Sequence, residues 1–253
     1  MSETYTIEVY NGDTQLDALV GLMEVDLSEP YNVFTYRYFV DQWPHLTYLA
    51  FSTSEALAGV PSAADVAARA QTRHFYAPCR DGTWRRLVGG IVCKLDIARR
   101  TGLHRGYIAM LAVDSDYRRH GIGRAVTTRA LDDMVALGAD EITLETETTN
   151  TTSLAFYERF GFVRARMMPN YYLYAGDAYK LVLALPASGP SEDDDAQNGT
   201  GENESAPATE KEHKQAPAPQ NPQQQHGNSS GNNSGNNNSG KKAKKGSKRK
   251  GRR

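Results

Sequence analysis

Residues 107–123 read YIAMLAVDSDYRRHGIG and join an apolar run to a turn that contains two glycines. The run at 107–113 is almost continuously apolar, as in a strand that is buried on both faces. After the turn, apolar residues recur at helical spacing over 123–137, and Gly138 follows as a stop signal. The pattern predicts a buried strand, a tight turn that is open to a ligand, and a helix.

The turn has the composition of an anion-binding loop. Gly121 and Gly123 allow close approach of the backbone, and the amides of residues 120–124 lie at a helix N-terminus without helical partners. The expected phosphate contacts are Arg118, Arg119, His120, Gly121, Ile122, Gly123 and Arg124. An ordinary strand–helix turn is the alternative, but the buried strand, the arginine and the helix together favour a phosphate cradle.

Other nucleotide and catalytic motifs are not matched. A dinucleotide fingerprint would need a further glycine at Val126, and a P-loop would need Gly-Lys followed by Ser or Thr. No combination of His, Asp and Ser suggests a catalytic triad. The cysteines, Cys79 and Cys93, lack metal-ligand spacing, so we expect no metal site.

The first 186 residues alternate between strand and helix patterns. We expect strands at 6–10, 48–51, 86–97, 107–113, 141–147, 162–168 and 179–185, and helices at 14–23, 33–43, 62–71, 123–137 and 151–160. Residues 52–84 are expected to be an insertion between strands. This order predicts one α/β domain over residues 1–186, with a mixed sheet and helices on both faces.

The composition changes at about residue 187. Residues 187–253 contain no aromatic residue and consist largely of Gly, Asn, Ser, Pro, Gln and charged residues. Such a segment cannot bury enough apolar surface to offset its ordering entropy, so we expect a disordered low-complexity tail. The tail begins acidic, at 192–195, and has a basic end from Lys241 to Arg253.

Targeting and membrane signals are missing from the sequence. Two cysteines without a pairing pattern favour a reduced, intracellular compartment. No apolar run reaches the roughly 18 residues of a transmembrane helix, so we expect no membrane contact. The first residues lack the basic and apolar regions of a signal peptide.

The run Arg118-Arg119-His120-Gly121-Ile122-Gly123 matches the R/Q-x-x-G-x-G/A signature of GCN5-related N-acetyltransferases, the GNAT superfamily. The chain resembles this superfamily over nearly all of residues 7–185, apart from the insertion. The resemblance implies the GNAT fold, with a mixed, mostly antiparallel seven-stranded sheet that splays at the acetyl-CoA cleft. It also implies acetyl-CoA as the co-substrate, with no metal.

Further segments resemble the catalytic subunits of NatC-type N-terminal acetyltransferases. These are Glu29-Pro30-Tyr31, Tyr36-Arg37-Tyr38-Phe39, 108–114, Leu144-Glu145-Thr146-Glu147, 154–157 and Tyr171-Tyr172-Leu173. The resemblance implies acetylation of nascent proteins that begin with Met followed by a bulky hydrophobic residue. It implies two partners, a large auxiliary scaffold subunit and a small Sm-like subunit.

Three residues are expected to move protons. Glu145 lies on the polar face of the strand 141–147, and a solvated strand face is the alternative. The resemblance favours Glu145 as general base, with Glu29 in the substrate-side loop as its rival. It implies that Tyr157 protonates the leaving thiolate, whereas helical spacing alone would make Tyr157 a core residue.

The resemblance also implies the remaining contacts. On the cofactor side they are the backbone of Leu111, Ala112 and Val113 at the thioester carbonyl, together with Asn150 and Tyr157. Asn150 is equally a helix N-cap. On the substrate side the contacts are Leu27, Glu29, Pro30, Tyr31, Tyr171 and Tyr172.

Two other functions stay open at this point. One is acetylation of lysine side chains or small amines, and the other is a catalytically silent GNAT-fold binding subunit whose tail contacts RNA. The basic end, from Lys241 to Arg253, fits solvated disorder, a nuclear localisation signal or an arm that binds ribosomal RNA phosphates. We expect a cytoplasmic, ribosome-associated protein, with a nuclear pool if the basic end acts as a localisation signal.

Overall fold

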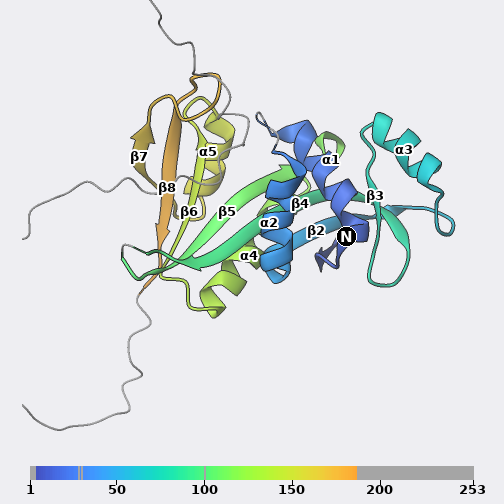
Figure 1. Ribbon diagram of the computed structural model, residues 1–253, viewed down its shortest axis with the longest axis horizontal. Coiled ribbons are helices and arrows are strands. Elements are labelled where there is room, and N and C mark those ends of the chain that lie inside the picture. The colour runs from blue at the N-terminus through green and yellow to red at the C-terminus, as the bar shows by residue number, and fades with distance from the viewer. Residues whose placement is uncertain (1–3, 28, 30, 100, 187–253) are drawn as a thin grey trace, which may run out of the picture. The chain divides into compact units, whose positions relative to one another are not determined.

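The computed structural model describes residues 4–27, 29, 31–99 and 101–186 (Figure 1). Their sheet has the order β1-β2-β4-β5-β6-β8-β7, and β3 pairs with the first residues of β4. The strands are β1 (Tyr5–Val9), β2 (Thr47–Ala56), β3 (Tyr76–Pro78), β4 (Trp84–Ile97), β5 (His104–Val113), β6 (Glu141–Glu147), β7 (Val163–Met168) and β8 (Ala178–Ala184). Only β5 and β6 are parallel among these pairs. The predicted mixed, mostly antiparallel sheet is confirmed, with β3 as one additional strand.

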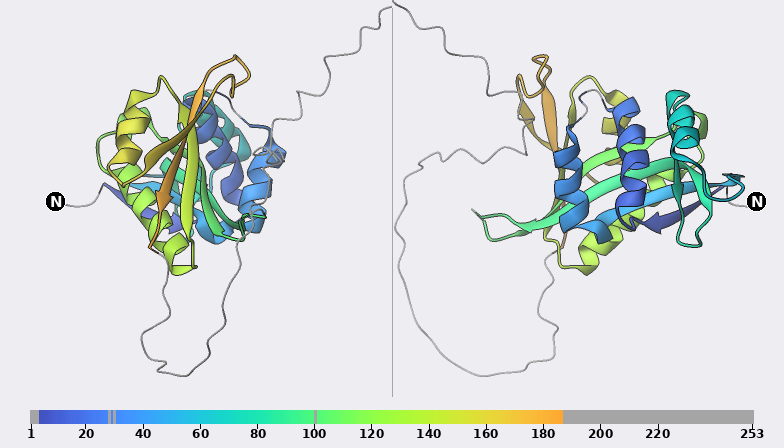
Figure 2. Two further views of the ribbon diagram at one scale, coloured as in Figure 1. Left: turned by 90° about the vertical axis from the view of Figure 1, so that its left-hand side faces the viewer. Right: turned by 45° about the vertical axis from the view of Figure 1, so that its right-hand side comes forward.

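Helices cover both faces of the sheet. On one face lie α1 (Leu16–Asp26) and α2 (Val33–Gln42), and on the other lie α4 (Ile122–Ala136) and α5 (Thr151–Glu158) (Figures 1 and 2). The sheet therefore separates two apolar cores. Leu19 and Phe39 belong to the core under α1 and α2, whereas Val126 and Leu154 belong to the core under α4 and α5. The predicted two-faced α/β domain is confirmed.

The segment 52–84 is built onto the same sheet. It contains the end of β2, the helix α3 (Ala63–Gln71) and β3. Ser62 begins α3 with a capping box, because its hydroxyl accepts from the Asp65 amide at 3.2 Å and the Asp65 carboxylate accepts from the Ser62 amide at 3.2 Å. The helix matches the prediction. β3 was not predicted, since three residues are too few to show an alternating pattern.

The strands β5 and β6 separate partway along their length. They pair only where Arg105, Gly106 and Tyr107 lie opposite Glu141, Ile142 and Thr143. A bulge at Ala109 accompanies the separation, because Val92 pairs with Met110 and Cys93 pairs with Ile108. Beyond Tyr107, β5 pairs only with β4 within the described part of the chain. The predicted splay is confirmed at this position.

Two remaining expectations concern the C-terminal tail and membrane-spanning helices. The predicted tail, with its acidic start and its basic end, lies outside the described residues. Among the helices that the structure describes, none has the length and apolarity to cross a membrane.

Candidate active site

The phosphate loop (residues 118–124) takes its shape from two left-handed backbone positions. Arg119 has φ 69° and Gly121, the N-cap residue of α4, has φ 85°. Glycine adopts such a conformation without the steric cost that other residues meet. A 3₁₀ turn, Ser115–Tyr117, leads into the loop, and its cap Asp114 accepts from the Asp116 amide at 3.0 Å. The predicted tight turn between strand and helix is present.

The amides at the start of α4 are available to an anion. None of residues 120–124 donates its N–H to an acceptor among the described residues, whereas Ala125 donates to the Gly121 carbonyl at 2.9 Å. These N–H groups lie at the positive end of the helix dipole, and Arg119 and Arg124 are exposed beside them. The geometry fits a pyrophosphate group held by backbone donors and flanking arginines.

Gly89 lets α4 approach the sheet closely, and Gly123 lies next to the end of β5. A Cβ atom at Gly89 of β4 would come within 2.5 Å of the Ile122 side chain, so only glycine permits this approach. A Cβ atom at Gly123 would lie 3.5 Å from Val113 and 3.9 Å from Phe156. The phosphate loop therefore lies beside the end of β5, on the part of that strand that no longer pairs with β6.

Arg118 connects the phosphate loop to two other elements. Its guanidinium pairs with Asp26 at the end of α1, and its Nε donates to the Val113 carbonyl at 3.2 Å. His120 is exposed, and its Nδ1 lies 3.0 Å from the Arg118 carbonyl oxygen. Asp26 directly precedes Leu27, so the cofactor side is joined to the substrate-side loop. The residues Leu111, Ala112 and Val113 lie on the part of β5 that no longer pairs with β6.

Glu145 lies on β6 just beyond the last residue that pairs with β5. Its Oε2 accepts a hydrogen bond from the Tyr107 hydroxyl at 2.8 Å. Burial raises the pKa of the Glu145 carboxyl, and the Tyr107 hydrogen bond and the charges of Lys180 and Arg105 only partly oppose this. A carboxylate with a raised pKa at the strand separation has the properties of a general base.

Four tyrosines lie near enough to the Glu145 carboxylate to be affected by its charge. Burial raises the pKa of Tyr31, Tyr107, Tyr171 and Tyr172, and the negative charge of Glu145 raises each of them further. The rings of Tyr171 and Tyr172 meet edge to face, with their centroids 5.2 Å apart. These side chains come from the segment after α1, from β5 and from the connection between β7 and β8. The structure therefore brings the predicted tyrosine platform together around the predicted base.

Glu29 joins the two loops that flank this tyrosine site. Its Oε1 accepts from the Leu173 backbone amide at 2.7 Å, across 144 positions in the sequence. The negative charge of Glu29 also contributes to the raised pKa of Tyr31, after burial and Glu145. Glu29 therefore holds the loop at Leu173 in place and also adds negative charge near Tyr31. Leu27 packs at the edge of the α1 and α2 core, and Pro30 lies outside the described residues.

Tyr157 and Glu145 lie on opposite faces of the sheet. Tyr157 belongs to the core under α4 and α5, 5% exposed, and burial raises the pKa of its hydroxyl. Glu145 contacts Tyr107, which packs at the edge of the other core. Asn150 caps α5 by accepting from the Ser153 amide at 2.9 Å, so its N-cap role is observed.

Tyr107 is the site residue that sequence reasoning missed. In the sequence it is only the polar end of an apolar strand. Its role depends on the parallel register, which places Tyr107 opposite Thr143 and therefore two residues from Glu145 along β6. The expected splay at the acetyl-CoA cleft named no position along the strands, so nothing in the sequence singled out Tyr107. Within the described residues, no group of three or more His, Cys, Asp or Glu side chains is placed to hold a metal ion.

The chain matches a known family over most of its described part. The sequence model of the Acetyltransferase (GNAT) family matches residues 22–162. The chain is 40% identical over 173 residues to N-alpha-acetyltransferase 30 of Saccharomyces cerevisiae, covering 68% of this chain and 83% of that protein. It is 40% identical over 176 residues to N-alpha-acetyltransferase 30 of Homo sapiens, covering 70% of this chain but only 40% of that protein.

A solved structure has the same fold. The chain resembles a subunit in the crystal structure of the NatC complex bound to Gag peptide and CoA, with a TM-score of 0.58 and 38% sequence identity. The match covers 72% of this chain and 99% of that one. The resemblance that was inferred from the phosphate loop and the tyrosine segments is confirmed.

Proposed function

Because the chain belongs to the acetyltransferase (GNAT) family, we propose that it acetylates the α-amine at the N-terminus of proteins. The observation that carries the proposal is the Glu145 carboxylate, which is bonded to Tyr107 and lies near three other tyrosines where β5 and β6 separate. A site with carboxylates and aromatic rings suits a cationic amine that is followed by an apolar side chain. The relatives named N-alpha-acetyltransferase 30 support the same substrate class.

Acetyl-CoA is the acetyl donor and supplies the acetyl group as an activated thioester. The free amides of residues 120–124, with Arg118, Arg119 and Arg124, hold its pyrophosphate. The backbone of Leu111, Ala112 and Val113 offers hydrogen-bond donors to the carbonyl oxygen, and Asn150 lies at the pantetheine arm. These groups lie on, or directly after, the parts of β5 and β6 that no longer pair with each other, and this placement supports their assignment to acetyl-CoA.

Glu145 removes a proton from the substrate amine. A free α-amine has a pKa of about 8 and is largely protonated at neutral pH. The raised pKa of Glu145 makes its carboxylate a better proton acceptor than an exposed glutamate, either directly or through a water molecule. Glu29 is the weaker candidate for this role, because its carboxylate already accepts the Leu173 amide and so holds the loop.

Tyr157 returns a proton to the departing thiolate. Burial keeps its hydroxyl protonated throughout the working pH range, so a proton is available when the thiolate forms. Neither residue forms a covalent bond to the substrate in this scheme. Glu145 takes one proton from the ammonium, and the neutral amine then forms a bond to the thioester carbonyl carbon. The C–S bond breaks as the hydroxyl proton of Tyr157 goes to sulfur, and the second proton lost from nitrogen restores the Tyr157 hydroxyl through solvent.

The preferred substrates are peptides that begin with Met followed by a bulky hydrophobic residue. Tyr31, Tyr171 and Tyr172 supply an aromatic surface for the second side chain. The similarity to a subunit of the NatC complex supports assembly with a large scaffold subunit and a small Sm-like subunit. Cytoplasmic action, ribosome association, a nuclear pool and RNA contact by the basic end remain predictions, since that segment lies outside the described residues.

A panel of peptides tests the proposal. The full chain, alone and with its copurifying partners, is incubated with acetyl-CoA and a Met-Leu peptide, and the product is located by fragment mass spectrometry. We expect acetylation of the α-amine, with no product when the N-terminus is blocked. Acetylation of lysine in the blocked peptide would instead support the side-chain alternative. CoA binding without any acetyl transfer would support a silent binding subunit.

A further inference from the structure

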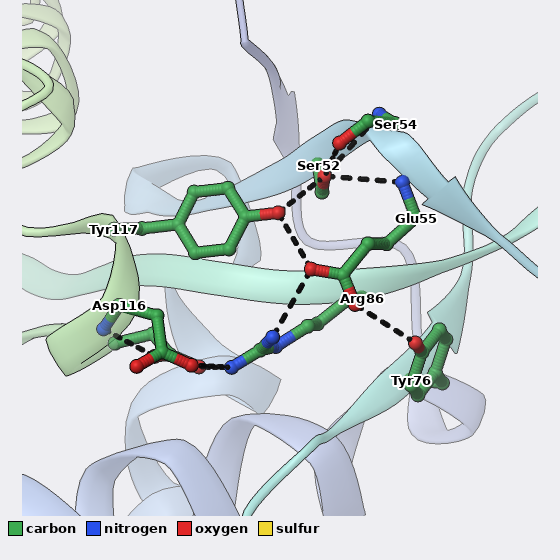
Figure 3. A network of polar contacts seen from close by, with 8 residues as sticks. Ser52, Ser54, Glu55, Tyr76, Arg86, Asp116 and Tyr117 are labelled. Carbon is green, nitrogen blue, oxygen red and sulfur yellow. Dashed lines mark hydrogen bonds and ion pairs between the residues drawn. The ribbon is translucent and has the colours of Figure 1, made fainter.

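A buried arginine lies next to the phosphate loop and outside the groups described so far. Arg86, near the start of β4, is 4% exposed. Its Nη2 lies 2.7 Å from Asp114 and 2.9 Å from Asp116, and its Nη1 lies 3.0 Å from Glu55. Its guanidinium also lies over the Tyr117 ring, 5.4 Å from the centroid. We call these five residues the Arg86 cluster (Figure 3).

Three members of the Arg86 cluster belong to the turn that leads into the phosphate loop. Asp114 caps this turn and is itself held by a bond from its amide to the Val88 carbonyl at 3.0 Å. Asp116 lies within the turn. Tyr117 immediately precedes Arg118, the first residue of the phosphate loop. A displacement of the turn would therefore be passed directly to the amides that face the phosphates.

The other end of the cluster lies on the segment 52–84. Glu55 of β2 accepts from the Tyr117 hydroxyl at 2.7 Å, and that hydroxyl is also 2.8 Å from the Ser52 hydroxyl. Tyr76 of β3 donates to the same carboxylate at 3.3 Å. Figure 3 shows Tyr76 and Tyr117 pointing to the Glu55 carboxylate, which in turn contacts Arg86. The segment is thereby connected to the cofactor side of the fold.

We propose that Arg86 is a positioning residue for acetyl-CoA, which sets the phosphate loop by holding Asp114, Asp116 and Glu55 around its buried guanidinium. The inference rests on the assignment of acetyl-CoA to that loop. It assigns a role in cofactor binding to the segment 52–84, which sequence patterns left without a function. The substrate side does not take part.

Charge gives Arg86 a second effect on the same loop. Asp114, Asp116 and Glu55 are acidic and lie within the cluster, while the ligand of the neighbouring loop is a polyanion. Burial alone would raise the pKa of Glu55, but the Tyr117 hydrogen bond and Arg86 lower it, so Glu55 is ionised. Without the guanidinium, the acidic residues would repel one another and the phosphates.

The shape of the guanidinium matters as well as its charge. Arginine presents several N–H donors in one fixed plane. In Arg86, Nη1 donates to Glu55, and Nη2 donates to both Asp114 and Asp116. Lysine offers one charged nitrogen and cannot hold the same three groups in this geometry. Arg86→Lys therefore separates the positioning effect from neutralisation alone.

The test compares CoA affinity among folded variants of the full chain. CoA is titrated calorimetrically without peptide, and the kinetic constants for acetyl-CoA and a Met-Leu peptide are measured separately. The variants are Arg86→Met, Arg86→Lys and Tyr117→Phe, and thermal unfolding reports whether each folds. Arg85→Met is the matched control, because Arg85 is the adjacent residue of β4 and pairs with Asp81 at 3.0 Å instead.

We expect Arg86→Met to raise the Kd for CoA about tenfold or more, and Arg86→Lys to raise it by about half that factor. Loss of one hydroxyl link in Tyr117→Phe should raise the Kd by about threefold. The KM for acetyl-CoA should follow the Kd, while the KM for peptide and kcat at saturating acetyl-CoA stay within about twofold of wild type. Arg85→Met should match wild type in every constant.

Unchanged CoA affinity in folded Arg86→Met would overturn the inference. If that variant does not fold, Tyr117→Phe decides, and a Kd equal to that of Arg85→Met would likewise overturn it. A loss confined to peptide KM or to kcat would also contradict the role. Failure of wild type itself to bind CoA would refute the cofactor assignment, and this inference with it, whereas binding with no acetyl transfer to peptide would refute only the proposed function.

Discussion

The phosphate loop presents backbone amides and arginines to solvent, whereas the amine side of the cleft buries a carboxylate among tyrosines. Arg119 and Arg124 are exposed, and the loop comes from seven consecutive residues, 118–124. On the amine side, Tyr31, Tyr107 and Glu145 come from three separate parts of the chain. The two sides also differ in the sign of their charge, since arginines flank the phosphate loop and carboxylates lie on the amine side.

The two sides of the site therefore differ in how strongly solvent and salt screen their charges. Attraction between an exposed arginine and a phosphate depends on charge at the surface and is screened by salt within about 10 Å at 0.1 M. Glu145 is largely buried, so the proposed interaction of its carboxylate with a bound amine would be screened less. Substitutions in the phosphate loop should therefore change the Kd and KM for the cofactor, whereas substitutions around Glu145 should change the kinetic constants for the peptide. Each should leave the constants of the other ligand nearly unchanged.

The largest effect should follow from Glu145→Gln. The amide keeps the size of the side chain but cannot accept the amine proton, so kcat for a Met-Leu peptide should fall about 10²- to 10³-fold. The Kd for CoA should stay at the wild-type value, as measured by calorimetry. Glu147→Gln is the matched control, two residues along the same face of β6, and should stay within about threefold of wild type. A Glu145→Gln enzyme with wild-type kcat would remove Glu145 from the role of base.

A smaller effect, on the binding of acetyl-CoA, should follow from Gly121→Val. Valine is strained at φ 85°, so the N-terminus of α4 should shift and the KM for acetyl-CoA should rise about tenfold. The KM for peptide should change little. Gly102→Val is the matched control. Gly102 has φ 72° and a Cβ atom there would meet no neighbour within 4 Å, so valine introduces similar backbone strain far from any packed side chain. Equal losses of cofactor affinity in both variants would mean that general instability, and not the loop, is responsible.

Glu29→Ala should affect the amine side more moderately. The Leu173 amide would lose its acceptor, so the loops that carry Tyr31 and Tyr171 would be less well placed and the KM for peptide should rise about fivefold. The KM for acetyl-CoA should be unchanged in steady-state assays. Glu24→Ala removes an exposed glutamate from α1 and should have no effect. A drop in kcat as large as that of Glu145→Gln would instead identify Glu29 as the base.

The smallest expected effect is a shift of the pH profile in Tyr107→Phe. The Tyr107 hydroxyl lowers the pKa of Glu145 against the larger opposing effect of burial, so its removal should raise that pKa further. Glu145 would then stay protonated to a higher pH, and the rising limb of kcat against pH should move to higher pH. Tyr10→Phe, which removes a buried hydroxyl whose charged neighbours are Asp13, Asp41 and Arg37, should leave the limb in place. A shift toward lower pH would contradict the arrangement described for Tyr107 and Glu145.

The helices and the two-faced architecture could be predicted because their signals are local. Helical spacing predicted α1, α2, α3, α4 and α5 to within a few residues at each end. The short strand β3 was missed, because its partner β4 follows it only after a turn and nothing in three residues indicates pairing. The Arg86 cluster was missed for a related reason, since its acidic partners lie 28 to 31 positions away.

The phosphate loop is contained in consecutive residues, so its glycines, arginines and following helix already define the backbone donors and the sign of the ligand. The amine side depends on which residues of distant strands are neighbours. The parallel register of β5 and β6 places Tyr107 beside Glu145, and the Glu29 to Leu173 bond brings two loops together. Register and loop packing follow from burial across the whole sheet, and for that reason only the tertiary structure decided the surroundings of Glu145.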